Sequence, residues 1–224
     1  MPGAAVTATA ARAPRRGTSP AVRRGIRIGI LVLVVAGVVL GTKVVPDGDA
    51  RASAGADAFD PATFGAETFP KVQAAVAERA EDAASLAEAI AADPDAAAEE
   101  FAVESSGGPV YSVTFTGVVG EGASGIYDVA VDGLPAGLTV RMQTGPAING
   151  TELRDATGDI AFGQFTNQIE YQNAASALNE ELKTAVLAGI DTASLTGRTV
   201  EVTGAFTLVN PDAWLVTPTE LEQG

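Results

Sequence analysis

The chain has 224 residues, with 28 acidic against 14 basic side chains, and it contains neither cysteine nor histidine. Its length allows one or two domains. The missing residue types exclude cysteine nucleophiles, disulfides, Ser-His-Asp triads and the usual zinc ligands. We therefore expect no catalytic residue, no cofactor and no metal site, and we predict that the protein is not an enzyme. A hydrolase that uses Glu152, Asp155 and Asp159 is the less favoured alternative.

Positive and negative charges occupy different parts of the chain. Seven of the 14 basic residues precede Pro46, whereas all 28 acidic residues follow it. The part from Pro46 onward therefore carries seven basic and 28 acidic residues, a net charge of −21. Phosphate backbones and anionic lipid headgroups repel such a body, so we expect no nucleic-acid partner.

The N-terminal part has the pattern of a membrane protein. Residues 1–27 are rich in Ala, Pro and Arg and predict a disordered basic tail. The uncharged run 28–42 would span about 22 Å as a helix, and Val44 and Val45 extend it toward the ~30 Å of a bilayer core. We therefore predict a transmembrane anchor over residues 28–45 that binds the chain to the membrane.

This run could be a retained signal-anchor or a cleaved signal peptide. The Ala-x-Ala sites at 50–52 and 52–54 lie about ten residues beyond the apolar run, which is far for signal cleavage, so we favour the anchor. The positive-inside rule then keeps the N-terminus in the cytoplasm. It predicts a single-pass protein of the cell membrane whose C-terminal domain is extracytoplasmic.

Between the anchor and the first strands, residues 46–57 have the composition of a linker, and residues 58–105 predict a helical segment. One helix is expected over Pro70–Ala92, because small apolar residues recur there at steps of three and four. Asp93-Pro94-Asp95 should end this helix and cap a shorter one that reaches about Ala102. The segment is expected to cover the following domain or to space it from the membrane.

Alternation with period two predicts five strands in residues 106–224. They are expected near residues 110–119, 127–131, 138–142, 200–209 and 214–221. Three strands, an insertion with a helix and two further strands are the order of an OB-like five-stranded β-barrel, so the expected fold class is α+β. Gly117 and Gly204 stand where its strands must bend. The Gly120–Gly125 segment matches G-x-G-x-x-G, but a strand follows it, so we interpret it as a hairpin turn.

The insertion Gly145–Asn179 holds polar residues at positions that secondary-structure propensity does not explain. Helical spacing predicts a helix over residues 168–188, with Asn167 as its N-cap and Glu170 completing a capping box. Asn179 is expected on the solvated side of this helix. Two phenylalanines, Phe162 and Phe165, are expected to plug the end of the barrel.

Six residues of the insertion are candidate contacts for a ligand or a partner. They are Asn149, Thr151, Arg154, Asp155, Asn167 and Gln168. Arg154 suits an anionic or hydroxylated ligand, with Asp155 and Asn167 as further contacts. The alternative is an internal Arg154–Asp155 ion pair that fixes the loop, with Asn167 serving only as a cap.

Three motifs stand out: G-P-A-I-N-G-T-E-L-R-D from Gly145, I-A-F-G-Q-F-T-N-Q-I-E-Y from Ile160 and A-L-N from Ala177, with F-D-P near Phe59, T-G-A-F and V-T-P-T-E-L-E in support. They resemble the DUF2291 family, whose members are described as predicted periplasmic lipoproteins of unknown function. The resemblance covers about residues 59–222 and carries no catalytic residue. Because members are often found beside sugar ABC-transporter components, it implies a transport-associated role. This chain lacks the lipobox cysteine, so the apolar helix would replace the lipid anchor.

We therefore predict a membrane-anchored extracytoplasmic protein that works as a non-enzymatic binding or accessory module, associated with a sugar ABC transport system. The alternative is a protein that binds or senses a small sugar-like ligand. A pocket lined by Arg154, Asp155 and Asn167 would favour ligand binding. Burial of these side chains in mutual hydrogen bonds would favour a rigid scaffold for interaction.

Overall fold

The computed structural model describes residues 59–224. The expected tail, membrane anchor and linker, at residues 1–27, 28–45 and 46–57, lie outside these residues. Within the described part, no helix is both long and apolar enough to cross a membrane. The fold class expected from the sequence included a transmembrane helix. The described residues show an α+β fold without one.

The helical segment consists of α2 (Pro61–Arg79), α3 (Ala83–Ala92) and α4 (Pro94–Phe101). The single helix expected over Pro70–Ala92 is wrong, because α2 begins nine residues earlier and the chain leaves it after Arg79. The early start has a local cause. The Asp60 carboxylate accepts hydrogen bonds from the first free backbone N–H groups, and Pro61 occupies the first helical position, where no N–H is needed.

The break between α2 and α3 is filled by β1 (Glu81–Asp82), which pairs in parallel with Val113 and Thr114 of the main sheet. The Asp82 side chain then caps α3. As expected, Asp93 caps α4 through the backbone N–H of Ala96.

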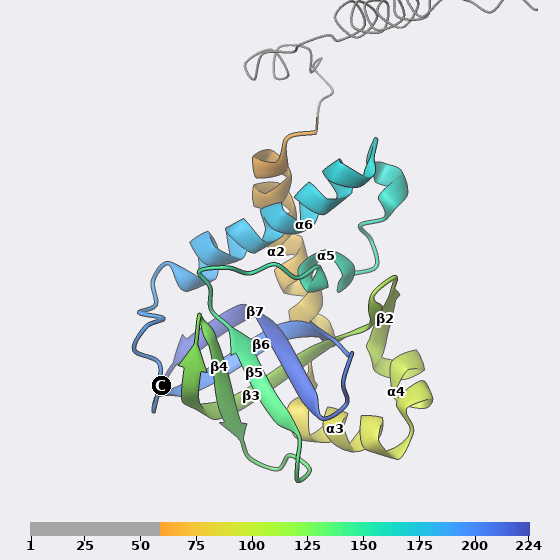
Figure 1. Ribbon diagram of the computed structural model, residues 1–224. Coiled ribbons are helices and arrows are strands. Elements are labelled where there is room, and N and C mark those ends of the chain that lie inside the picture. Colours follow the sequence, from red (N-terminus) through yellow and green to blue (C-terminus); the bar gives the residue numbers. More distant parts are fainter. Residues whose placement is uncertain (1–58) are drawn as a thin grey trace, which may run out of the picture. The chain divides into compact units, whose positions relative to one another are not determined.

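The rest of the fold consists of a seven-stranded sheet and the insertion between two of its strands (Figure 1). Besides β1 it contains β2 (Ala102–Ser105), β3 (Gly108–Ala123), β4 (Ile126–Val131), β5 (Thr139–Gln143), β6 (Thr199–Thr207) and β7 (Ala213–Gln223). Strands β3 to β7 are the five that alternation predicted. The expected five-stranded barrel is nevertheless wrong in strand number, because β1 and β2 both pair with β3.

The pairings of β3 to β7 form a closed circuit. β3 pairs with β4, β4 with β5, β5 in parallel with β7, β7 with β6, and β6 again with β3. The β7–β6 register shifts at Gly204, where an added Cβ would lie 2.5 Å from the carbonyl oxygen of Thr217. Gly204 therefore has no room for a side chain, in agreement with the expected bend. The G-x-G-x-x-G segment is a hairpin, as predicted, with Ser124 and Gly125 at positive φ in its turn.

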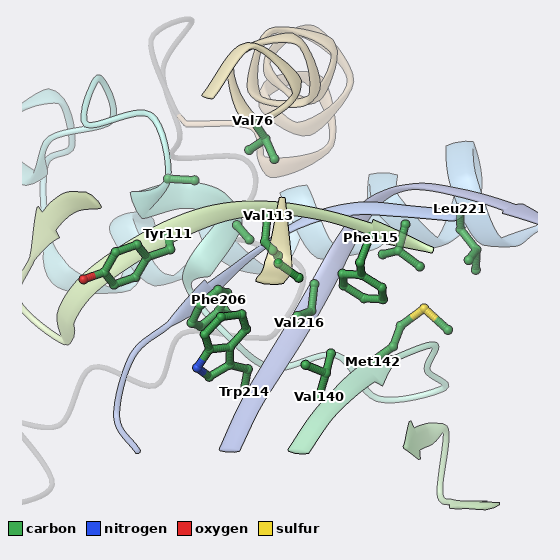
Figure 2. Close-up of a cluster of buried hydrophobic side chains, with 14 of the residues drawn as sticks. Val76, Tyr111, Val113, Phe115, Val140, Met142, Phe206, Trp214, Val216 and Leu221 are labelled. Carbon is green, nitrogen blue, oxygen red and sulfur yellow. The ribbon is translucent and has the colours of Figure 1, made fainter. Parts of the chain in front are cut away.

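The core combines side chains of α2 with side chains of the strands. Figure 2 shows Val76 of α2 on one side of β3, and Phe206, Trp214, Val140 and Met142 on the other side, among the strands. Its largest side chains are stacked. The Phe206 ring centroid lies 5.6 Å from that of Tyr111 and 4.5 Å from that of Trp214, and each pair is tilted by 19°. These three residues come from β3, β6 and β7, so the stack joins strands that are distant in the sequence.

The insertion between β5 and β6 contains α5 (Glu152–Asp155), the short 3₁₀ helix η1 (Phe162–Gln164), α6 (Gln168–Leu182) and the π-helical turn η2 (Lys183–Leu187). The helix predicted over 168–188 is thus confirmed in position, although its last turn is π-helical. Helix α6 packs closely against α2 (Figure 1). A Cβ at Gly65 of α2 would lie 2.9 Å from the Ala177 carbonyl oxygen of α6, so this crossing needs a glycine.

Candidate binding face on the α5–α6 segment

Helix α5 is a single turn that carries two buried charged residues in succession. Arg154 is 4% exposed and Asp155 is 7% exposed. Charged side chains are rarely buried unless they are paired. The partners of these two groups therefore determine what this turn can do.

Arg154 and Asp155 bind each other through two parallel contacts. Arg154 Nε donates to Asp155 Oδ1 at 2.7 Å, and Nη2 donates to Oδ2 at 2.9 Å. Such bidentate pairs are the strongest and most directional that arginine forms. The remaining terminal nitrogen of Arg154 donates to the Tyr171 carbonyl oxygen at 3.4 Å, and its Cζ lies 3.7 Å from the centre of the Tyr171 ring. The guanidinium is thus occupied by groups of the protein itself.

The carboxylate of Asp155 is also shared. Its Oδ2 accepts from the Thr151 hydroxyl at 2.8 Å, and its Oδ1 lies 3.5 Å from the Tyr171 hydroxyl. Burial raises the pKa of the Tyr171 phenol, the charge of Arg154 opposes that change, and Asp155 reinforces it. We call Thr151, Arg154, Asp155 and Tyr171 the clamp, because they tie α5 to α6.

A second polar group lies beside the clamp. Glu152 Oε2 is sealed from solvent and has no hydrogen-bond partner in the described part of the protein. Burial is the main cause that raises the pKa of this carboxyl, and the charge of Asp155 adds to it, while the Glu152 backbone N–H, the nearby Thr217 hydroxyl and the charge of Arg154 act in the opposite direction. Gln143 in turn donates to the Thr217 hydroxyl at 2.8 Å. Since Oε2 does not reach solvent, this carboxyl is poorly placed to act on a substrate.

Asn179 fixes the loop that precedes α5. Its Nδ2 donates to the carbonyl oxygens of Ile148 and Gly150 at 3.3 and 2.9 Å, and the residue is 3% exposed. The expectation that Asn179 is solvated is wrong, because the loop packs over this side of α6. In the sequence, only one feature indicates that Asn179 is buried. It lies beside Leu178 and one turn before Leu182, which both belong to the apolar side of α6.

Asn167 is an N-cap, as the sequence predicted. Its Oδ1 accepts from the backbone N–H groups of Ile169 and Glu170 at 2.9 and 3.0 Å. The Glu170 carboxylate reaches back to the N–H of Thr166 at 2.9 Å rather than to that of Asn167, so the capping box is shifted by one residue.

Two hollows flank Tyr171, and we call them the α6 hollows. The first, of about 430 Å³, lies between η1 and the β2–β3 turn and includes Asp155, Phe162 and Gln168 in its lining. The second, of about 370 Å³, is lined on its polar side by Ser106, Asn149, Thr151, Arg154, Gln168, Gln172 and Ser176. Tyr171 and Gln168 border both, so they form the ridge between the hollows.

The structure thus brings five of the six candidate residues to the α6 hollows. Asn149, Thr151, Arg154 and Gln168 line the second hollow, and Asp155 joins Gln168 at the first. Asn167 lines neither. Sequence reasoning missed Tyr171 as a site residue, although its aromatic ring carries the clamp and divides the hollows.

Phe162 and Phe165 do not plug the sheet. Phe162 is 50% exposed, and Phe165 packs on Phe59 and Phe64 at ring distances of 5.3 and 5.8 Å. Both residues therefore belong to the outer side of the insertion. No group of three or more acidic side chains that could hold a metal ion occurs within residues 59–224.

The strand order, with α6 inserted between β5 and β6, defines an OB-like protein. It is similar to the crystal structure of an OB-fold protein from Thermotoga maritima, with a TM-score of 0.57, 20% sequence identity and coverage of 74% of this chain and 99% of that chain. At this identity the similarity shows the fold alone. No curated protein matches the chain.

A family model described as "Predicted periplasmic lipoprotein (DUF2291)" matches residues 29–222, and the chain belongs to this family. The resemblance seen in the central motifs is confirmed. Membership makes the protein a membrane-associated protein outside the cytoplasm. The chain itself has no cysteine to carry a lipid.

Proposed function

We propose that the protein is a non-enzymatic accessory module that presents the α6 hollows and the ridge between them to a protein of a membrane transport system. The observation that carries this proposal is the closed clamp. The charged groups of Arg154 and Asp155 are paired with each other, and they also contact Thr151 and Tyr171. What remains accessible in the second hollow is a surface of amides and hydroxyls.

The chemistry of this surface suits contact with another protein. The exposed polar residues of the second hollow are neutral donors and acceptors: Ser106, Asn149, Gln168, Gln172 and Ser176. Neutral polar groups around a rigid centre can pair with backbone and side-chain groups of a partner at a low desolvation cost. The expected partner is a component of a sugar ABC transport system, since family members are often found beside such components.

Membrane attachment supports the same proposal. We infer that the segment before Phe59 holds the body on the extracytoplasmic side of the membrane. Confinement to that surface raises the effective concentration of the body near an integral membrane partner, so a modest contact area is sufficient.

The alternative function is the binding of a small sugar-like ligand in the second hollow, whose amides and hydroxyls could bind sugar hydroxyls. One feature disfavours it. Arg154 covers one face of the Tyr171 ring, and Phe162 and Phe165 both contact that ring, so it offers little free aromatic surface to stack on a sugar. We therefore favour the protein partner.

Site-specific photocrosslinking in native membranes tests the proposal. A benzophenone amino acid placed at Gln168 or Gln172 of the full chain should yield the same crosslinked transport protein. The matched control is Val209, which is 84% exposed in the β6–β7 turn and remote from α6 in the sequence. Equal yields at all three positions, or no product at Gln168 and Gln172, would refute the proposed face. A rise in melting temperature with a monosaccharide, lost in Gln168→Ala, would favour the ligand-binding alternative.

A further inference from the structure

An aromatic cluster lies where the described chain begins. Its five rings belong to Phe59, Phe64, Phe162, Phe165 and Tyr171. Neighbouring centroids lie between 5.3 and 5.8 Å apart, and the contacts run without a gap from Phe59 through Phe165 and Tyr171 to Phe162. The cluster thus joins the start of α2 to η1 and α6, and we call it the aromatic cluster.

Part of this region faces solvent. Phe162 is 50% exposed, and Ile169, in the first turn of α6, is 71% exposed. They are two of the four large apolar side chains that are exposed within the described residues. Scattered exposed apolar residues are ordinary. Phe162 belongs to the aromatic cluster, and Ile169 lies two positions before Tyr171 of the same cluster, so two exposed apolar side chains occur at this end of α6.

The position of this surface in the chain suggests what covers it. Phe59 contacts both Phe64 and Phe165, so the described chain begins within the cluster, directly after the segment that we infer attaches the body to the membrane. Figure 1 shows that α2 begins on the α6 side of the body, with α3 at the opposite end.

The charges around the cluster decide which membrane surface fits. Residues 59–68 and 157–172 include Asp60, Glu67, Asp159 and Glu170, and neither segment contains Lys or Arg. Anionic lipid would repel these carboxylates, so electrostatic attraction cannot hold the surface to a bilayer. Aromatic side chains, however, favour the headgroup region of uncharged bilayers, where part of each ring leaves water.

We propose that the aromatic cluster rests in the headgroup region of the bilayer to which the chain is attached, with Phe162 and Ile169 inserted furthest. The occupant of this apolar surface is a zwitterionic lipid interface. The contact orients the body with the α6 side toward the membrane and α3 away from it. The contact rests on the membrane attachment inferred above. Phe162 and Tyr171 also line the first hollow, so this orientation leaves the amides of the second hollow for the protein partner.

Tryptophan fluorescence can test this contact in the full chain. The sequence has one tryptophan, Trp214, which is 1% exposed and supplies a constant background. Ile169→Trp and Phe162→Trp place a second indole in the proposed contact, and Val209→Trp places one in the β6–β7 turn as a control. Each variant is reconstituted into phosphatidylcholine vesicles whose acyl chains carry bromine close to the headgroup.

We expect brominated lipid to quench the added emission of Ile169→Trp and Phe162→Trp severalfold more than that of Val209→Trp. Ile169 is so exposed that its replacement cannot disturb the core, which keeps the test valid if Phe162→Trp fails to fold. Unquenched emission typical of water would overturn the proposal. Emission that is shifted to the blue without quenching would also overturn it, because a second copy of the protein would then cover the surface. Quenching that appears only when phosphatidylglycerol is added would refute the zwitterionic interface.

Discussion

Arg154 and Asp155 are adjacent in the sequence and still form a bidentate ion pair, with contacts of 2.7 and 2.9 Å. Adjacent residues of a helix do not face each other. The pair forms because the Tyr171 ring supports the guanidinium from α6 and the Thr151 hydroxyl holds the carboxylate from the preceding turn. A charge-neutral, hydrogen-bonded unit thus takes the place of two free charges beneath the proposed binding face.

Removing one partner of this pair should be costly. Arg154→Ala leaves the buried Asp155 carboxylate unpaired, and we expect residues 58–224 to lose about 3–5 kcal/mol of unfolding free energy. Denaturant unfolding measures this loss. The control is Glu180→Ala, which removes the ion-pair partner of Lys183. The Glu180 side chain is 71% exposed, so this substitution should cost less than ~1 kcal/mol of unfolding free energy. An Arg154→Ala variant as stable as wild type would show that the clamp is not structural.

Glu152 should make stability depend on pH. Its carboxyl pKa is raised above the ordinary value of 4.5, mainly by burial, so the folded protein holds this proton more tightly than the unfolded chain. The contribution of Glu152 to stability therefore falls as the pH rises from 4.5 through the raised pKa. Glu152→Gln removes this decline, and its advantage over wild type should grow with pH across that window in denaturant unfolding. A difference between Glu152→Gln and wild type that is constant with pH would contradict the prediction.

The cap of α6 can be separated from any binding role of Asn167. Asn167→Ala removes the acceptor for two backbone N–H groups and should lower the unfolding free energy by about 1 kcal/mol, whereas Asn167→Asp should retain most of it. Thermal unfolding of both variants measures the effect. Crosslinking through Gln168 should persist in Asn167→Asp; if it disappears while the stability is kept, Asn167 contacts the partner directly.

Two glycines offer a matched test of the sheet. A methyl group at Gly204 would lie 2.5 Å from the Thr217 carbonyl oxygen, so Gly204→Ala should destabilise the body by about 1–3 kcal/mol. A methyl group at Gly163 meets no atom within 4 Å, so Gly163→Ala should be neutral or stabilising by up to ~1 kcal/mol. Chemical unfolding of the two variants side by side decides whether the close approach of β7 to β6 requires a glycine at position 204.

Local patterns predicted most of this fold. Strands β3 to β7 were visible because period-two alternation reports which face of a strand is buried. The start of α6 was visible because Asn167 carries an acceptor for the free N–H groups. β1 and the break after Arg79 were not visible, because a two-residue strand exists only through its pairing with Val113 and Thr114.

The candidate site was predicted in composition but not in arrangement. Arg154 and Asp155 stood out because charged residues in an irregular, apolar stretch require partners, and the ion pair was one of the two alternatives considered. The role of Tyr171 depends on a contact across 17 residues, which no local pattern encodes. The burial of Asn179 depends on the loop around Ile148 and Gly150, which no pattern within α6 encodes.

The closed circuit of β3 to β7 limits how another protein can recognise this one. Each of these strands pairs with two others, and the remaining strands of the described sheet, β1 and β2, have only two and four residues. A longer stretch with a single strand neighbour is Thr217–Gln223 of β7, beyond its pairing with β5, but four of its first five residues are buried. An incoming peptide therefore finds no long exposed strand edge on which to extend the sheet. Within residues 59–224, recognition must be made by side chains and turns, and substitutions at single surface positions should be enough to abolish it.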